Sequence, residues 1–147
     1  MDKSRFEEQA EKIADEAADA DTITNALRGV IFSIGCWTTA FDTVSIGEAF
    51  VTNPNGGTVA TIGNSSYGWG SPGNPGFGYS DKFDDRFWYA IARTDDYRLG
   101  DALGAAKARY APYSHDRNVY RWHQYQLNLM GDPELAVWTR APESLAV

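Results

Sequence analysis

The sequence predicts an α/β fold in which parallel strands alternate with helices. A short apolar run at residues 30–35, preceded by Gly29, has the pattern of a strand that is buried on both faces of a sheet. A second β-branched run follows at residues 58–63, after a segment that begins with a Ser-x-x-Glu capping box at Ser45 and Glu48. Strand, helix and strand within about thirty residues form a βαβ unit, so we expect the two strands to be parallel and their crossover right-handed.

The size and charge of the chain limit what it can be. Its 147 residues, 43% of them hydrophobic, are enough for one domain and too few for two ordinary ones. A net charge of −7 argues against a nucleic-acid partner, which requires clustered Lys and Arg. The sequence has no apolar run long enough to span a membrane, and its start lacks the apolar core of a signal peptide, although the chain can be part of a longer one. The single cysteine excludes an internal disulfide.

The two ends of the chain have different patterns. Residues 1–20 place apolar side chains at helical spacing behind a capping box at Ser4 and Glu7, which predicts an acidic amphipathic helix with a solvated outer face. A short second helix is expected at residues 21–27, before the first strand. Residues 140–147 carry no such pattern and are expected to form a frayed tail.

Cys36 follows the first predicted strand directly. The carboxyl ends of parallel strands are where open α/β folds place their ligand crevices, so Cys36 occupies a position suited to a nucleophile. The alternative is a small buried hydrophobic residue, which is the commoner situation for a lone cysteine. The strand pattern alone leaves both interpretations open.

The segment after the second predicted strand, residues 63–80, is rich in glycine and aromatic residues. A loop of this length is typically either mobile or functional, and its rings favour a surface that binds something. The alternative, that the rings only pack back onto the sheet, has similar weight. No glycine-rich phosphate-binding motif is present, so nucleotide binding is not indicated.

Helices are predicted to resume in the second half of the chain. We expect one from Ser80 and another from Asp95, each with an apolar stripe that is more typical of core than of a site. A third predicted helix carries on one face Trp122, Tyr125 and Leu129. After a turn at residues 131–133, residues 135–138 have the pattern of a final strand.

Three blocks of the sequence, in order and at suitable spacing, resemble the gingipain-like cysteine peptidases, whose clan also includes caspases and legumains. They are FSIGCWTTAFD at residues 32–42, GGTVATIGNSS at residues 56–66 with WGSP at residues 69–72, and LMGDPEL at residues 129–135. Residues 98–107 look like the helix that this family places between the last two blocks. The resemblance covers most of the chain from about residue 22, and it rests on the order of the blocks rather than on any single one.

The resemblance implies a three-layer α/β/α sandwich of the caspase-like type with a mostly parallel sheet, and makes residues 1–147 a portion of a single gingipain-type peptidase domain. It also implies that Cys36 is the nucleophile. The residues that it places around the substrate are Gly35, Trp37, Ser65, Ser66 and Trp69. Of these, Trp69 is expected to border the groove beside Cys36 rather than to fill the core. In this family a histidine upstream of the cysteine generates or holds the attacking thiolate, because a free thiol is mostly protonated near neutral pH.

The sequence departs from the family pattern at this histidine. Its two histidines, His115 and His123, both lie downstream of Cys36, and neither is followed by glycine. We therefore expect them to be surface or packing residues. Either the chain is the carboxyl-terminal half of a peptidase domain, with the missing amino-terminal half as its partner, or it is an inactive relative that has lost the catalytic pair.

Two classes of function remain open at this point. The first is a cysteine endopeptidase, or a related transpeptidase that attaches secreted cargo to a cell surface, acting on a polypeptide substrate. The second is a non-catalytic caspase-like module that binds a peptide or protein partner through residues 63–80. The resemblance implies an extracellular or cell-surface location for either class.

No cofactor is indicated by the sequence. Some relatives bind calcium, and the oxygens of Asp81, Asp84 and Asp85 could contribute to such a site. Acidic residues at the start of a helix are explained by the helix dipole alone, however, so we assign no metal ligands.

Overall fold

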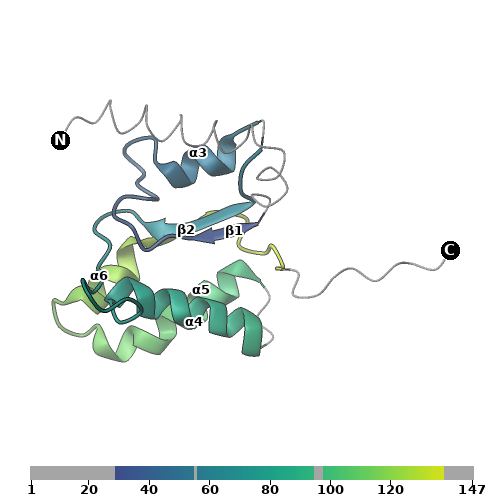
Figure 1. Cartoon of the computed structure of the whole chain (residues 1–147). Helices are drawn as coiled ribbons and strands as arrows, with labels where there is room; N and C mark the ends of the chain where they lie inside the picture. The colour runs from purple at the N-terminus through teal and green to yellow at the C-terminus, as the bar shows by residue number, and fades with distance from the viewer. Residues whose placement is uncertain (1–28, 55, 95–97, 138–147) are drawn as a thin grey trace.

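The computed structural model describes residues 29–54, 56–94 and 98–137. In this part of the chain a sheet of three strands lies between two layers of helices (Figure 1). One face is covered by α3 (Ile46–Thr52), and the other by α4 (Tyr79–Arg93), α5 (Leu99–Tyr110), the short 3-10 helix η1 (Ala111–Tyr113) and α6 (Val119–Gln126). The predicted α/β class and its layered arrangement are therefore confirmed.

The strand order in the sheet is β1 (Val30–Phe32), β2 (Ala60–Asn64) and β3 (Leu127–Gly131). β1 pairs with β2 in parallel, with Val30 opposite Ala60, whereas β2 pairs with β3 in antiparallel orientation. The central strand β2 is buried along its whole length. β1, α3 and β2 thus form the predicted βαβ unit, and the parallel pairing of its strands is confirmed.

The local sequence explains how α3 begins and how closely it packs. Ser45 adopts an extended backbone conformation, and its side chain accepts a hydrogen bond from the N–H of Glu48 at 3.3 Å, as the capping box predicts. Gly47 is buried at the second position of the helix, and a Cβ atom there would lie 2.6 Å from the carbonyl oxygen of Thr38. Glycine therefore lets α3 approach the chain that leads away from β1.

The hydrophobic core lies between the sheet and the α4–α5 layer. Its largest fully buried apolar side chains are Ile62, Phe83, Phe87, Leu99 and Leu127. They come from both layers, and the ring of Phe32 on β1 adds a contact with Phe87 at 5.4 Å between centroids. Burying rings and branched side chains from both layers in this way is the main stabilising contribution of such a core.

The predicted helix around residue 125 is present, but its predicted end is wrong. α6 ends at Gln126, so Leu129 lies in β3. The buried side chains of α6 are His123 and Gln126, whereas Trp122 and Tyr125 are 45% and 70% exposed. The polar side chains of α6 turn inward because they find buried hydrogen-bond partners there.

The predicted final strand at residues 135–138 is also placed wrongly. Up to residue 137, where the described part ends, this segment forms only an isolated bridge between Arg98 and Ala136. The strand that completes the described sheet is β3, which satisfies its backbone by pairing with five residues of β2.

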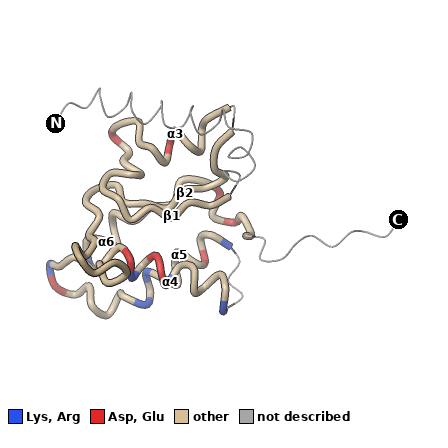
Figure 2. Tube along the Cα trace, viewed as in Figure 1, with Lys and Arg blue, Asp and Glu red and all other residues tan. Residues whose placement is uncertain are grey.

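Charged residues are distributed unevenly between the two layers. The described lysines and arginines all lie on the side of α4, α5 and α6, whereas the α3 side carries acidic residues (Figure 2). None of the helices in the described part is long and apolar enough to cross a membrane. The helices predicted within residues 1–27, the helix start at Asp95 and the tail at residues 140–147 lie outside the described residues.

Candidate active site

Two loops leave the sheet at the carboxyl ends of the parallel strands β1 and β2, at the edge beside α6 (Figure 1). We call residues 33–45 the cysteine loop and residues 65–78 the glycine loop. The cysteine loop extends the backbone pairing of β1 with β2 through three further hydrogen bonds, to β2 and to the residues directly after it. Its donors are the N–H groups of Ser33, Trp37 and Thr39, which donate to the carbonyl oxygens of Ile62, Ser66 and Asn64. The turn that carries Cys36 is therefore fixed to the end of the central strand.

Cys36 is exposed to solvent, four positions beyond the last residue of β1. Its Sγ accepts a hydrogen bond from the N–H of Gly68 at 3.2 Å and lies 3.7 Å from the carbonyl oxygen of the same residue. The expected accessibility of Cys36 is confirmed, because the sulfur lies at the edge of the sheet rather than in the core. The two loops meet at this sulfur.

Only glycine fits at position 68. A Cβ atom built there would collide with the carbonyl oxygen of Ile34 and would lie 2.8 Å from the carbonyl carbon of Gly35. The absence of a side chain lets the backbone of the glycine loop lie directly against the cysteine loop. Sequence reasoning missed Gly68, because nothing local distinguishes it from the other glycines of its loop.

Trp37, next to Cys36, has a left-handed backbone with φ of 55°. This conformation costs a residue with a side chain about 1–2 kcal/mol. Two contacts hold Trp37 in place: its N–H donates to the carbonyl oxygen of Ser66 at 2.7 Å, and its ring lies 4.5 Å from that of Tyr67. The glycine loop thus stabilises the strained turn after Cys36.

A buried polar network lies behind the two loops. Asn64 donates to the carbonyl oxygen of Gly35 at 3.1 Å. Gln126 donates to the side-chain oxygen of Asn64 at 3.4 Å and to the carbonyl oxygen of Tyr67 at 2.6 Å. The carbonyl of Gln126 in turn accepts from the N–H of Ser65 at 2.7 Å. One amide side chain at the end of α6 therefore connects the backbones of both loops.

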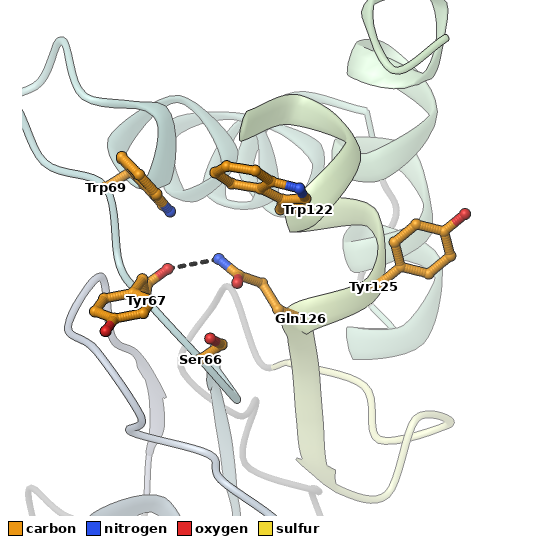
Figure 3. A pocket seen from close by; sticks show the side chains of 6 residues that line it. All are labelled: Ser66, Tyr67, Trp69, Trp122, Tyr125 and Gln126. Carbon is orange, nitrogen blue, oxygen red and sulfur yellow. Dashed lines mark hydrogen bonds between the residues drawn. The ribbon is translucent and has the colours of Figure 1, made fainter. Parts of the chain in front are cut away.

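A cavity of about 480 Å³, which we call the aromatic cavity, opens between the glycine loop and α6. Its lining residues are Ser66, Tyr67, Trp69, Trp122, Tyr125 and Gln126 (Figure 3). The rings of Trp69 and Trp122 lie 5.4 Å apart, and the lining carries no charged group. The indole nitrogen of Trp69 is buried and has no hydrogen-bond partner among the described residues. Such a space suits an apolar or aromatic group.

A second cavity, of about 590 Å³, lies on the other side of Trp69. It is lined by Ile34 and by residues 68–73 of the glycine loop, with Asp81 as its one charged lining residue. Trp69 is half-buried and borders both cavities. Trp69 follows Gly68 in the chain and is not among the fully buried core residues.

Neither histidine of the sequence forms a hydrogen bond with Cys36 in the described part of the chain. His115 is exposed, and its ring contacts Asp116 and the carbonyl oxygen of Pro112. His123 is fully buried, with both ring nitrogens bonded, to Ser80 and to the carbonyl oxygen of Val119. His115 is thus a surface residue and His123 a packing residue, as expected.

The remaining predicted site residues lie around the sulfur in different ways. Gly35 and Trp37 flank Cys36 in the cysteine loop, and Ser66 lines the aromatic cavity. Ser65 contributes its backbone N–H to the network behind the loops. Sequence reasoning did not predict Trp122, Tyr125 and Gln126 as site residues. The available signal was the pair of aromatic residues Trp122 and Tyr125, about one helical turn apart.

The aspartates considered for calcium lie on α4, away from the aromatic cavity. Burial raises the pKa of Asp84 above its usual value, a hydrogen bond with Trp88 opposes this, and the charges of Asp81 and Asp85 add to the rise. Among the described residues, no group of three or more His, Cys, Asp or Glu side chains is arranged to hold a metal ion.

Comparison with known proteins gives one match. The model of Peptidase family C25 matches residues 7–138, which is most of the chain. Neither the curated proteins nor the solved structures include a match to the sequence. The matched segment contains Cys36 and both loops, and it agrees with the resemblance found from the sequence blocks. The chain therefore belongs to peptidase family C25, the gingipain family of cysteine peptidases.

Proposed function

We propose that this chain carries the nucleophile and part of the substrate groove of a cysteine peptidase, with Cys36 attacking the carbonyl carbon of a peptide bond. The observation that carries the proposal is the meeting of the two loops at an exposed Sγ. There the sulfur accepts a hydrogen bond from the N–H of Gly68, which lines one of the two cavities that Trp69 borders.

The reaction needs a base that the described residues do not place at Cys36. Both ring nitrogens of His123 are occupied in the core, and His115 is bonded at the surface. We therefore propose that an imidazole outside this sequence, from the amino-terminal half of the domain, completes the site. It would take the proton of the thiol, and after the S–C bond forms and the C–N bond breaks, the leaving amine would take that proton. Water, or the amine of an acceptor in a transpeptidase, would then release the acyl group from sulfur.

The aromatic cavity is proposed as the place where a substrate side chain or an adjacent peptide segment binds. Its lining is uncharged, and two of its rings, Trp69 and Trp122, come from separate elements and lie next to each other (Figure 3). The cysteine and glycine loops contain a single charged residue, Asp42. Recognition in this cavity would therefore depend on ring contacts and on hydrogen bonds to backbone groups.

The proposal can be tested without turnover, by covalent labelling of Cys36. A peptidyl chloromethyl ketone, with phenylalanine or arginine next to the reactive group, is compared with chloroacetone, which has the same reactive group and no peptide. We expect mass spectrometry to find the label on Cys36, and the ratio of the two rates to fall about tenfold in Trp69→Ala, equivalent to about 1.4 kcal/mol of lost binding. The rate with chloroacetone alone should change little.

Trp88→Ala is the matched control, because Trp88 is a partly exposed tryptophan on α4 that lines neither of the two cavities beside Cys36. It should leave the rate ratio at the wild-type value. Equal ratios in wild type and Trp69→Ala would contradict the proposal that Trp69 lines the substrate groove. A loss of stability of about 3–5 kcal/mol in Trp69→Ala would assign the ring to the core instead.

A second function is favoured by the engagement of both histidines away from Cys36. We propose as the alternative a non-catalytic module that binds a peptide in the same aromatic cavity. The two are distinguished by comparing wild type with Cys36→Ala. Acyl transfer that occurs in wild type and is lost in the variant indicates a peptidase, whereas equal peptide binding by calorimetry in both proteins, with no acyl transfer in either, indicates a module. For either function we propose a place outside the cell or at its surface, which the family supports.

A further inference from the structure

The buried pair Ser80 and His123 is not used by the proposed chemistry. Both side chains are fully buried, and they come from α4 and α6, 43 residues apart in sequence. Ser80 Oγ lies 2.9 Å from His123 Nε2, and His123 Nδ1 lies 2.9 Å from the carbonyl oxygen of Val119. The ring stacks on Phe83 with an interplanar angle of 12°. A polar pair in such surroundings has to be fully hydrogen-bonded to be tolerated.

The partners determine the direction of each hydrogen bond. A carbonyl oxygen only accepts, so Nδ1 of His123 carries the hydrogen that is donated to Val119. In the neutral ring Nε2 is then an acceptor, and the hydroxyl of Ser80 donates to it. Burial lowers the pKa of His123, and the bond to Val119 only partly opposes this, so the ring is neutral near pH 7.

Besides His123, Ser80 contacts the glycine loop. Its Oγ accepts a hydrogen bond from the N–H of Trp69 at 2.9 Å, and its own N–H donates to the carbonyl oxygen of Trp69 at 3.1 Å. The backbone of Trp69 is thus held on both its donor and its acceptor side by one residue. The preceding residue, Gly68, is the one that contacts the sulfur of Cys36.

We propose that Ser80 and His123 are positioning residues that fix the backbone of Gly68 and Trp69 against Cys36. His123 fixes the rotation of the Ser80 hydroxyl, and this orients a lone pair of Oγ toward the N–H of Trp69. The pair touches neither the sulfur nor the aromatic cavity, so it acts through the backbone of the glycine loop alone. The catalytic relevance of this positioning rests on the proposed function. The test of the positioning itself does not, because its readout requires no turnover.

The test is amide hydrogen exchange in the full chain, with two amides of the same loop compared. Trp69 donates to Ser80, whereas Ser65 donates to the carbonyl oxygen of Gln126. In Ser80→Ala we expect exchange at Trp69 to become about tenfold faster than in wild type, as the loss of one buried hydrogen bond allows. Exchange at Ser65 should change less than threefold. Equal acceleration at both amides would show only general destabilisation and would overturn the proposal, as would unchanged exchange at Trp69.

His123→Phe keeps a ring against Phe83 but removes the acceptor for Ser80, so we expect a smaller acceleration at Trp69. The exposed His115→Phe is the matched control and should have no effect on that amide. If the Ser80 and His123 variants do not fold, the proposed hydrogen-bond directions are tested on the wild-type protein. Nitrogen-15 NMR at pH 7 should show a neutral His123 protonated at Nδ1, and a ring protonated at Nε2 would overturn the proposed direction of the bonds.

Discussion

The cysteine loop and the glycine loop both leave the carboxyl ends of parallel strands, yet they are held in different ways. The cysteine loop continues the backbone pairing of the sheet, through the N–H groups of Ser33, Trp37 and Thr39. The glycine loop is held largely by side chains of the helix layer: Ser80 at the start of α4, directly after the loop, and Gln126 at the end of α6. The position of the nucleophile thus depends on backbone pairing within the sheet, whereas the position of the surface beside it depends on helix side chains.

The largest expected effect comes from separating the two loops. Gly68→Ala places a methyl group against the carbonyl of Ile34, so we expect unfolding free energy to fall by about 3 kcal/mol. Gly70→Ala is the control, because a Cβ atom at Gly70 meets nothing within 4 Å; its effect should stay within about 0.5 kcal/mol. Urea denaturation measures both, and equal effects would show that the loops are not in close contact.

Removing the side chain that connects both loops should have the next largest effect. Gln126→Ala leaves the carbonyl of Tyr67 and the side chain of Asn64 without their donor, for an expected loss of about 2 kcal/mol. Gln124→Ala, at a half-buried position of the same helix, removes hydrogen bonds to the carbonyl oxygen of Lys107 and to the side chain of Ser114, for an expected loss of about 1 kcal/mol. A larger loss at Gln124 would contradict the role given to the buried amide.

The buried histidine should make stability depend on pH. The pKa of His123 is lowered in the folded state from its ordinary value of 6.5, so the unfolded chain binds more protons as the pH falls below that value. Stability should therefore fall below pH 6.5, with a contribution of at most about 1.4 kcal/mol per pH unit. Denaturation curves at pH 7.5 and 5.5 should show this contribution in His115→Gln but not in His123→Gln. The same pH dependence in both variants would assign it to other groups.

The smallest effect concerns the indole nitrogen in the aromatic cavity. Trp69 Nε1 is buried without a partner among the described residues, so Trp69→Phe removes an unsatisfied donor and keeps an aromatic ring. We expect the melting temperature to stay equal or to rise slightly, while the labelling ratio of Cys36 falls toward that of Trp69→Ala. A clear loss of stability would indicate that the nitrogen has a partner in the folded chain.

The same contrast explains which features the sequence could predict. The βαβ unit follows from β-branched runs and from the cap at Ser45, which act over a few residues. The place of Cys36 after a strand allowed either a nucleophile or a packing residue, and its assignment as nucleophile came from the family resemblance. Gly68 could not be singled out, because its necessity arises from the backbone of a loop more than thirty positions earlier. The strand β3 was missed because residues 122–129 have aromatic and aliphatic side chains at helical spacing, and pairing with β2 overrides that pattern.

The most direct test of the central claim is acyl transfer to Cys36 in the presence of added imidazole, which replaces the missing histidine. A peptidyl 4-nitrophenyl ester is mixed with the chain, and the release of nitrophenolate is followed with and without imidazole. The account predicts a burst of one nitrophenolate per chain that imidazole accelerates, a thioester at Cys36 in the mass spectrum, and neither in Cys36→Ala. A release that is the same in wild type and Cys36→Ala at every imidazole concentration would contradict the assignment of Cys36 as the nucleophile.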